Sequence, residues 1–136
     1  MFKNRTRLFA LEIIRLVESL PRSRVGDVIG RQLLRSGTSV GANYRAACRG
    51  KSASDVIAKL GIVEEEADES ICWLELLVDG CIVVPDRIGT IRKEANELLA
   101  MTVASIKTMR AENNSRFWIL DYGRIDFGLG CRKFGF

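Results

Sequence analysis

Histidine is absent from this chain of 136 residues, so the commonest general base and the commonest metal-binding side chain are both missing. The four cysteines are scattered and form no C-x-x-C pair, which leaves a zinc site without the usual ligand spacing. We therefore expect no cofactor and no metal site. The bland interpretation is that the cysteines are small buried residues in a reducing cytoplasm. They are Cys48, Cys72, Cys81 and Cys131.

Long apolar runs are also missing. No stretch of about 18 apolar residues occurs, so no transmembrane helix is predicted. The basic residues 1–10 lead into a segment that charges interrupt, and no secretory signal peptide is visible. We expect a cytoplasmic protein with no membrane association.

Proline is scarce, and Pro21 and Pro85 separate segments with helical periodicity. The strongest pattern is a seam of apolar residues that alternates steps of four and three from Val56 to Cys81. The sequence predicts an all-α fold, an antiparallel up-down-up-down four-helix bundle formed by residues 1–114. The helices are expected at about residues 5–19, 25–48, 54–82 and 86–112.

The C-terminal residues 115–136 differ in composition from the rest of the chain. They hold four of the glycines and six of the ten aromatic residues. We expect an irregular tail, and a docking or stacking arm is the alternative.

Small and polar residues crowd the second predicted helix between Arg35 and Arg49, including Gly37 and Gly41. Each glycine costs a helix about 1 kcal/mol relative to alanine. Such a run is useful where helices must approach closely. It predicts a helix pressed against its neighbours, with a few polar groups held inside.

Charge is divided unevenly along the chain. Residues 1–51 carry eleven Lys and Arg against three Asp and Glu, whereas residues 52–112 carry six against twelve. The basic half can meet phosphate, or the two halves can attract each other within or between subunits. No named nucleic-acid-binding motif is present. The candidate phosphate-facing residues are Arg15, Arg22, Arg24, Arg31, Arg45, Arg49 and Lys51.

Residues 32–47, QLLRSGTSVGANYRAA, together with the acidic third segment and its WLELL, resemble a family of four-helix-bundle proteins. These are encoded in intervening sequences of bacterial large-subunit ribosomal RNA genes. The resemblance covers roughly residues 5–110. It departs at Val56, where many members have an aromatic residue, and it has no counterpart for the tail.

The resemblance implies a small helical bundle that assembles into a symmetric ring, typically a pentamer. A related protein is the accessory variability determinant of diversity-generating retroelements. That protein is a basic pentameric barrel that partners a reverse transcriptase and binds nucleic acid. The resemblance brings no established activity.

A second group of residues is predicted to hold the structure or assembly together. Asn43 is expected to make a buried hydrogen bond that fixes helix register or assembly. Arg35 is expected to pair with an acid of the third helix, within or between subunits. The group comprises Arg35, Ser39, Asn43, Glu65, Glu66 and Glu69.

Two functions remain open at this point. The first is a non-enzymatic oligomer that binds RNA or DNA through the basic surface of the first two helices. The second is a protein-interaction scaffold with no nucleic-acid role. An enzyme is not expected, because no residue set for catalysis is present.

Overall fold

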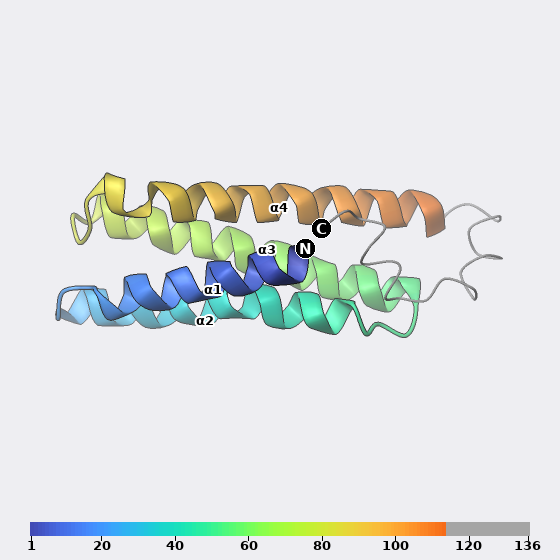
Figure 1. Cartoon of the computed structure of the whole chain (residues 1–136), viewed down its shortest axis with the longest axis horizontal. Coiled ribbons are helices and arrows are strands. Elements are labelled where there is room, and N and C mark those ends of the chain that lie inside the picture. Colours follow the sequence, from blue (N-terminus) through green and yellow to red (C-terminus); the bar gives the residue numbers. More distant parts are fainter. Residues whose placement is uncertain (114–136) are drawn as a thin grey trace.

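Four helices form the described part of the chain, residues 1–113 of a computed structural model (Figure 1). They are α1 (Phe2–Glu18), α2 (Arg24–Ala47), α3 (Ala53–Asp79) and α4 (Pro85–Asn113). No strand occurs within these residues, and the prediction of an all-α four-helix bundle is confirmed. The predicted tail, residues 115–136, lies outside the described residues.

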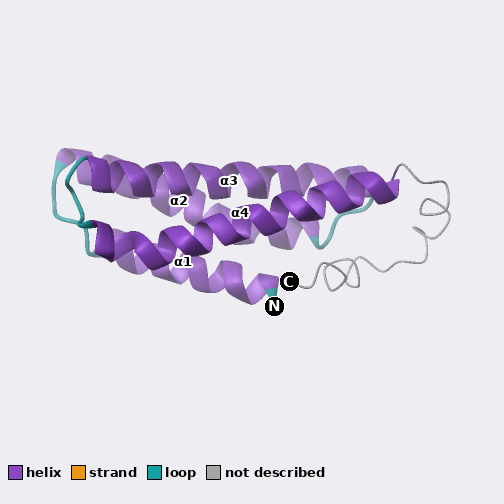
Figure 2. Ribbon diagram, turned by 90° about the horizontal axis from the view of Figure 1, so that it is seen from above, coloured by secondary structure: helices purple, strands orange, loops and turns teal. Residues whose placement is uncertain are grey.

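Short loops connect the helices, and the chain reverses direction at each of them (Figure 1). Helix α2 packs against α1 and α3, and α4 packs against α3 and, less extensively, α1. Helix α1 is the shortest, and α4 runs on beyond the level at which α1 begins (Figure 2). None of the helices in residues 1–113 is long and apolar enough to span a membrane.

Serine caps fix the starts of α2 and α3. The Ser23 hydroxyl accepts a hydrogen bond from the backbone N–H of Gly26, and Ser52 accepts one from that of Asp55. Each serine therefore satisfies one of the N–H groups that lack a partner in the first turn.

The end of the third helix was predicted too late. Helix α3 stops at Asp79 instead of residue 82, and Gly80 is its C-cap. Cys81 follows with φ 59°, in the left-handed region, which a continuing α-helix cannot use. The apolar pattern continues past this turn, because the spacing of apolar residues carries no information about the backbone conformation of Cys81.

The start of the first helix was predicted too late, at about residue 5, since α1 begins at Phe2. Phe2 is 1% exposed, and its ring lies 4.3 Å from that of Tyr44, centroid to centroid. Burial raises the pKa of Tyr44 to about 12, because a tyrosinate would lose its hydration.

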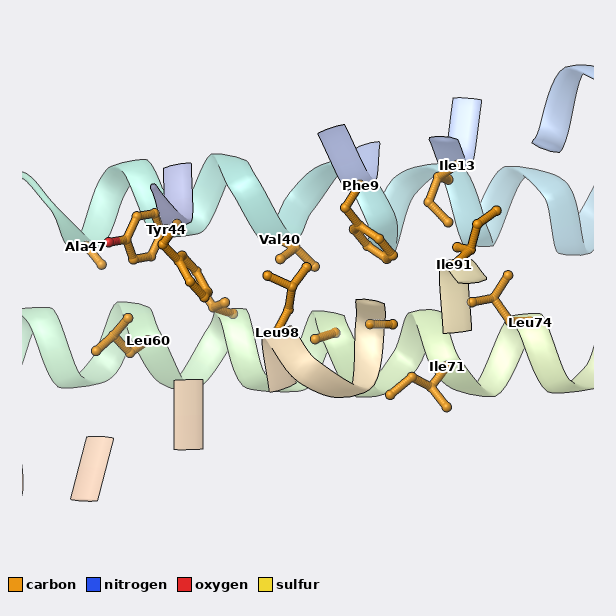
Figure 3. Packing of buried hydrophobic residues seen from close by; sticks show 14 of the residues in the cluster. Phe9, Ile13, Val40, Tyr44, Ala47, Leu60, Ile71, Leu74, Ile91 and Leu98 are labelled. Carbon is orange, nitrogen blue, oxygen red and sulfur yellow. The ribbon is translucent and has the colours of Figure 1, made fainter. Parts of the chain in front are cut away.

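Apolar side chains from all four helices meet along the bundle axis, as seen for Phe9, Val40, Leu74 and Leu98 (Figure 3). These four side chains are almost completely buried. Helix α3, which carries the predicted seam, supplies the largest share of the buried apolar residues, from Ala53 through Leu77.

The small residues of α2 permit the close approach that the sequence predicted. A Cβ atom at Gly37 would lie 2.9 Å from Cγ1 of Ile13, and one at Gly41 would lie 3.1 Å from Oγ1 of Thr6. On the α3 side, the buried hydroxyls of Ser36 and Ser70 lie 3.0 Å apart. A buried polar contact thus joins α2 to α3, while α2 and α1 pack through glycine.

The prediction that the cysteines are buried is wrong for Cys72 and Cys81, which are exposed free thiols. Cys72 lies on the outward face of α3, because its neighbour Ile71 takes the core position. Cys81 lies beyond the end of that helix.

Candidate nucleic-acid interface

A groove of about 510 Å³ runs along the outer surface where α1 and α2 pack together. Helix α1 contributes a row at steps of three and four residues, and α2 contributes another. The lining residues are Lys3, Asn4, Thr6, Arg7 and Ala10 of α1, and Thr38, Gly41, Ala42 and Arg45 of α2.

The glycine contacts fix the register between α1 and α2, the two helices that form the walls of the groove. Gly41 packs on Thr6, and Gly37 packs on Ile13. Since the helices run in opposite directions, Arg45 lies level with the start of α1, and Thr38 lies level with Ala10. Lys3 and Arg45 therefore lie at the same end of the groove, and Arg7 lies one turn further along α1.

The charge of this groove is not neutralised within the described residues. Lys3, Arg7 and Arg45 are exposed and form no ion pair there. Among the described residues, no carboxylate lines the groove. By contrast, a hollow between α1 and α4 contains Glu12 together with Arg15.

The predicted phosphate-facing residues do not form one cluster. All are exposed, but only Arg45 lines the groove. Arg24 and Arg31 continue along the outer face of α2, with Arg24 about 30 Å from Arg45 along the helix axis. Arg15 faces the α1–α4 side. Arg49 and Lys51 lie near the end of α2, and Arg22 lies in the loop before it.

Arg35 is committed to a different role. Its guanidinium binds both Glu66, at 3.2 Å, and Glu69 of α3. The hydrogen bonds that Arg35 donates to Glu69 and Glu66 raise the pKa of Arg35, and the one to Glu69 lowers the pKa of that carboxyl. Glu65, the third expected partner, is exposed and does not contact Arg35, because it projects from the outward face of α3.

Within residues 1–113, Asn43 makes no hydrogen bond to another helix, and its expected role in assembly stays a prediction. Its side-chain amide donates to the backbone carbonyl of Ser39, 2.8 Å away in the same helix, and the residue is half-buried. The Ser39 hydroxyl likewise donates to the carbonyl of Arg35. Both side chains thus donate to a carbonyl of their own helix, one turn back.

Sequence comparison identifies the family to which this bundle belongs. The family model described as 23S rRNA-intervening sequence protein matches residues 2–104, which include all of α1, α2 and α3 and most of α4.

The chain is a member of the 23S rRNA-intervening sequence protein family. A similar solved structure is a protein with unknown function from the S23 ribosomal protein family of Bacteroides thetaiotaomicron. The two chains share 34% sequence identity and superpose with a TM-score of 0.74, over 79% of this chain and 99% of the other. No curated protein matches the chain.

Two residues of this family member's groove were missed by sequence reasoning. Lys3 and Arg7 were counted in the basic half but not proposed as a site. The available signal was their spacing of four residues, continued by Ala10, on the face of α1 opposite the buried Phe9. The sequence alone did not show that Arg45 lies across the groove from Lys3 and Arg7.

Sequence reasoning also missed the cluster that joins α1 to α4. The Arg5 guanidinium donates to Glu94, at 2.8 and 2.9 Å, and to Glu97, at 2.7 Å. These partners are nearly ninety residues or more away in the sequence, so no local pattern links them.

No group of three or more His, Cys, Asp or Glu residues within residues 1–113 is arranged to hold a metal ion. The acidic run of α3 shows why: Ala67 faces the core, while Glu65 and Asp68 point outward and Glu66 and Glu69 bind Arg35.

Proposed function

We propose that this intervening-sequence protein is a non-enzymatic homo-oligomer that binds the backbone of RNA or DNA through the basic surface of α1 and α2. One observation carries the proposal. Lys3, Arg7 and Arg45 come together in a groove that contains no carboxylate, and none of them has an ion-pair partner within residues 1–113. Phosphate is the ligand that such unpaired cations favour.

The contrast with Arg5 and Arg35 supports this assignment. Both of those arginines bind two carboxylates of a neighbouring helix, so the fold uses them for its own cohesion. The groove cations contribute nothing comparable to the fold. Unpaired like charges placed close together repel, and a polyanion relieves that repulsion.

Oligomerisation is supported by apolar side chains left on the surface. Val25 and Val28 on α2 are about half exposed, as are Leu8 on α1 and Leu76 on α3. Assembly into a ring would repeat the groove, so that several weak contacts act together on one nucleic acid.

A scaffold without a nucleic-acid role is the second candidate. It is favoured by Glu65 and Asp68, which lie exposed on α3 and outside the Arg35 network. In an assembly, this acidic face of one subunit can meet the basic groove of the next. Replacing the groove cations with neutral residues would then dissociate the oligomer.

The test replaces Lys3, Arg7 and Arg45 with Gln together. The matched control replaces three exposed cations of α4, Lys93, Lys107 and Arg110, in the same way. Binding of labelled RNA and DNA is measured at low salt, with the oligomer mass recorded on the same samples.

We expect the groove variant to lose roughly tenfold to a hundredfold in affinity, because three phosphate contacts are removed. The control should lose much less, and both should keep their mass. Equal affinities for the groove variant and the native protein would refute nucleic-acid binding at this surface. A groove variant that dissociates, in a protein that binds no nucleic acid, would establish the scaffold instead.

A further inference from the structure

We infer that the groove between α1 and α2 receives an unpaired base, so that the preferred ligand is single-stranded nucleic acid. This inference rests on the proposed function and specifies its substrate class. Cations on a convex surface are sufficient for binding phosphate. The hollow beside them is a separate feature, and it requires a separate explanation.

Small side chains create the hollow next to the cations. Ala10 on one wall and Thr38 on the other line the part of the groove away from Lys3, and Ala42 lines its middle beside Gly41, which packs on Thr6. The surface there is largely methyl groups and backbone. A base can lie on such a surface through its flat face, as apolar contacts in nucleic-acid sites do.

The polar groups around the hollow suit a nucleotide. Arg7 and Arg45 project from opposite walls, and a guanidinium plane stacks on a base as readily as it binds phosphate. The Asn4 amide is exposed and has both a donor and an acceptor for a base edge. Lys3 adds a point charge at the end of the groove where Arg45 lies.

A duplex does not match this arrangement. Its bases are stacked and paired inside, and only phosphates, sugars and groove edges reach a protein. A base of a single strand is free to leave the chain axis and enter a hollow between two helices. The groove therefore favours a single strand over a duplex of the same charge density.

The test fills the hollow without altering its charge. Ala42→Leu is suitable because Ala42 is exposed, so the added side chain enters the groove and not the core. Ala104→Leu makes the same change at an exposed alanine of α4 and serves as the control. The probes are a labelled single-stranded RNA of mixed sequence and a blunt RNA duplex that contains it.

We expect the native protein to bind the single strand more tightly than the duplex. Ala42→Leu should weaken single-strand binding about tenfold, the scale of losing one stacked base, and leave duplex binding unchanged. Ala104→Leu should change neither. Circular dichroism and thermal unfolding show whether both variants retain the native fold.

Three results would overturn the inference. If the native protein binds duplex as tightly as single strand and Ala42→Leu alters neither, the groove holds no base although the proposed function stands. If Ala42→Leu changes the oligomer mass, the groove is occupied by a second copy of the chain. If the Lys3, Arg7 and Arg45 variant binds both probes like the native protein, the proposed function itself fails.

Discussion

Arginines of the basic half differ in function according to what the adjoining helix presents to them. Arg5 meets Glu94 and Glu97 of α4, and Arg35 meets acids of α3. Arg7 of α1 and Arg45 of α2 line a groove in which residues 1–113 place no acid. A charge count along the sequence therefore overstates how many cations are available to an external ligand.

The Arg35–Glu69 pair makes the stability of the bundle sensitive to acid. The folded state lowers the pKa of Glu69 below its ordinary value, chiefly through the hydrogen bond from Arg35. A lowered pKa means that the stabilisation is present above the pKa of the unfolded state and is lost as pH falls through the folded value. We expect the free energy of unfolding to decrease less with falling pH in Glu69→Gln than in the native protein.

The measurement is denaturant unfolding of the native protein and Glu69→Gln at a series of pH values from neutral down to about 3. Glu65→Gln is the control, because Glu65 is exposed and does not contact Arg35. Identical acid dependence in the native protein and Glu69→Gln would mean that the pair does not form in solution.

At the scale of the elements, the α1–α2 contact depends on glycine. A methyl group at Gly37 would lie within 3.0 Å of two Ile13 carbons, whereas one at Gly61 of α3 would meet no atom within 4 Å. We expect Gly37→Ala to lower the free energy of unfolding by about 1–3 kcal/mol through overpacking. Gly61→Ala should raise it by up to about 1 kcal/mol through helix propensity.

Thermal and denaturant unfolding of the two variants check this pair of predictions. Both variants replace glycine with alanine in a helix. Opposite changes in the free energy of unfolding would therefore separate the effect of packing α1 on α2 from the effect of helix propensity. A Gly37→Ala variant as stable as Gly61→Ala would show that the two helices are not in close contact.

The Arg5 cluster is the main polar link across the α1–α4 seam, where packing is least extensive. Its side chain is 28% exposed, and it binds two carboxylates at once. We expect Arg5→Met to cost about 1–2 kcal/mol, more than a typical surface pair. Hydrogen exchange in α1 should increase more than exchange in α3.

Arg92→Met is the matched control, since Arg92 pairs with Glu75 across the α3–α4 seam and both side chains are about half exposed. That substitution should change stability by less than about 1 kcal/mol. Equal losses for the two variants would contradict a special role for Arg5.

Prediction from sequence succeeded where the signal is local or periodic. The seam from Val56 to Leu74, the stop before Pro21 and the close contact at Gly37 and Gly41 all follow from spacing and side-chain size. The end of α3 was wrong because Cys81 adopts a left-handed conformation within an apolar pattern that continues.

The candidate site was less predictable, because it depends on which residues lie across a helix pair. Lys3 and Arg7 are about forty residues from Arg45 in the sequence, and only the Gly41–Thr6 contact brings the two rows level. Asn43 was predicted to bond a neighbouring helix. In the described chain its amide donates instead to the carbonyl of Ser39, an acceptor of the same helix.

At the scale of the whole molecule, the bundle has a basic side on α1 and α2 and an acidic outer face on α3. The family to which the chain belongs, and its similarity to the Bacteroides protein, establish the bundle itself. The function proposed here follows from which cations the bundle leaves unpaired. Its central claim is that these cations bind phosphate.

The most direct test is the affinity of the full chain for single-stranded RNA across a salt series, with the oligomer mass recorded at each salt concentration. If the three groove cations each contact a phosphate, the logarithm of the binding constant should fall linearly with the logarithm of the salt concentration. The slope should be about −2 for each protomer engaged. An absence of binding at low salt, with the protein folded, would contradict the account.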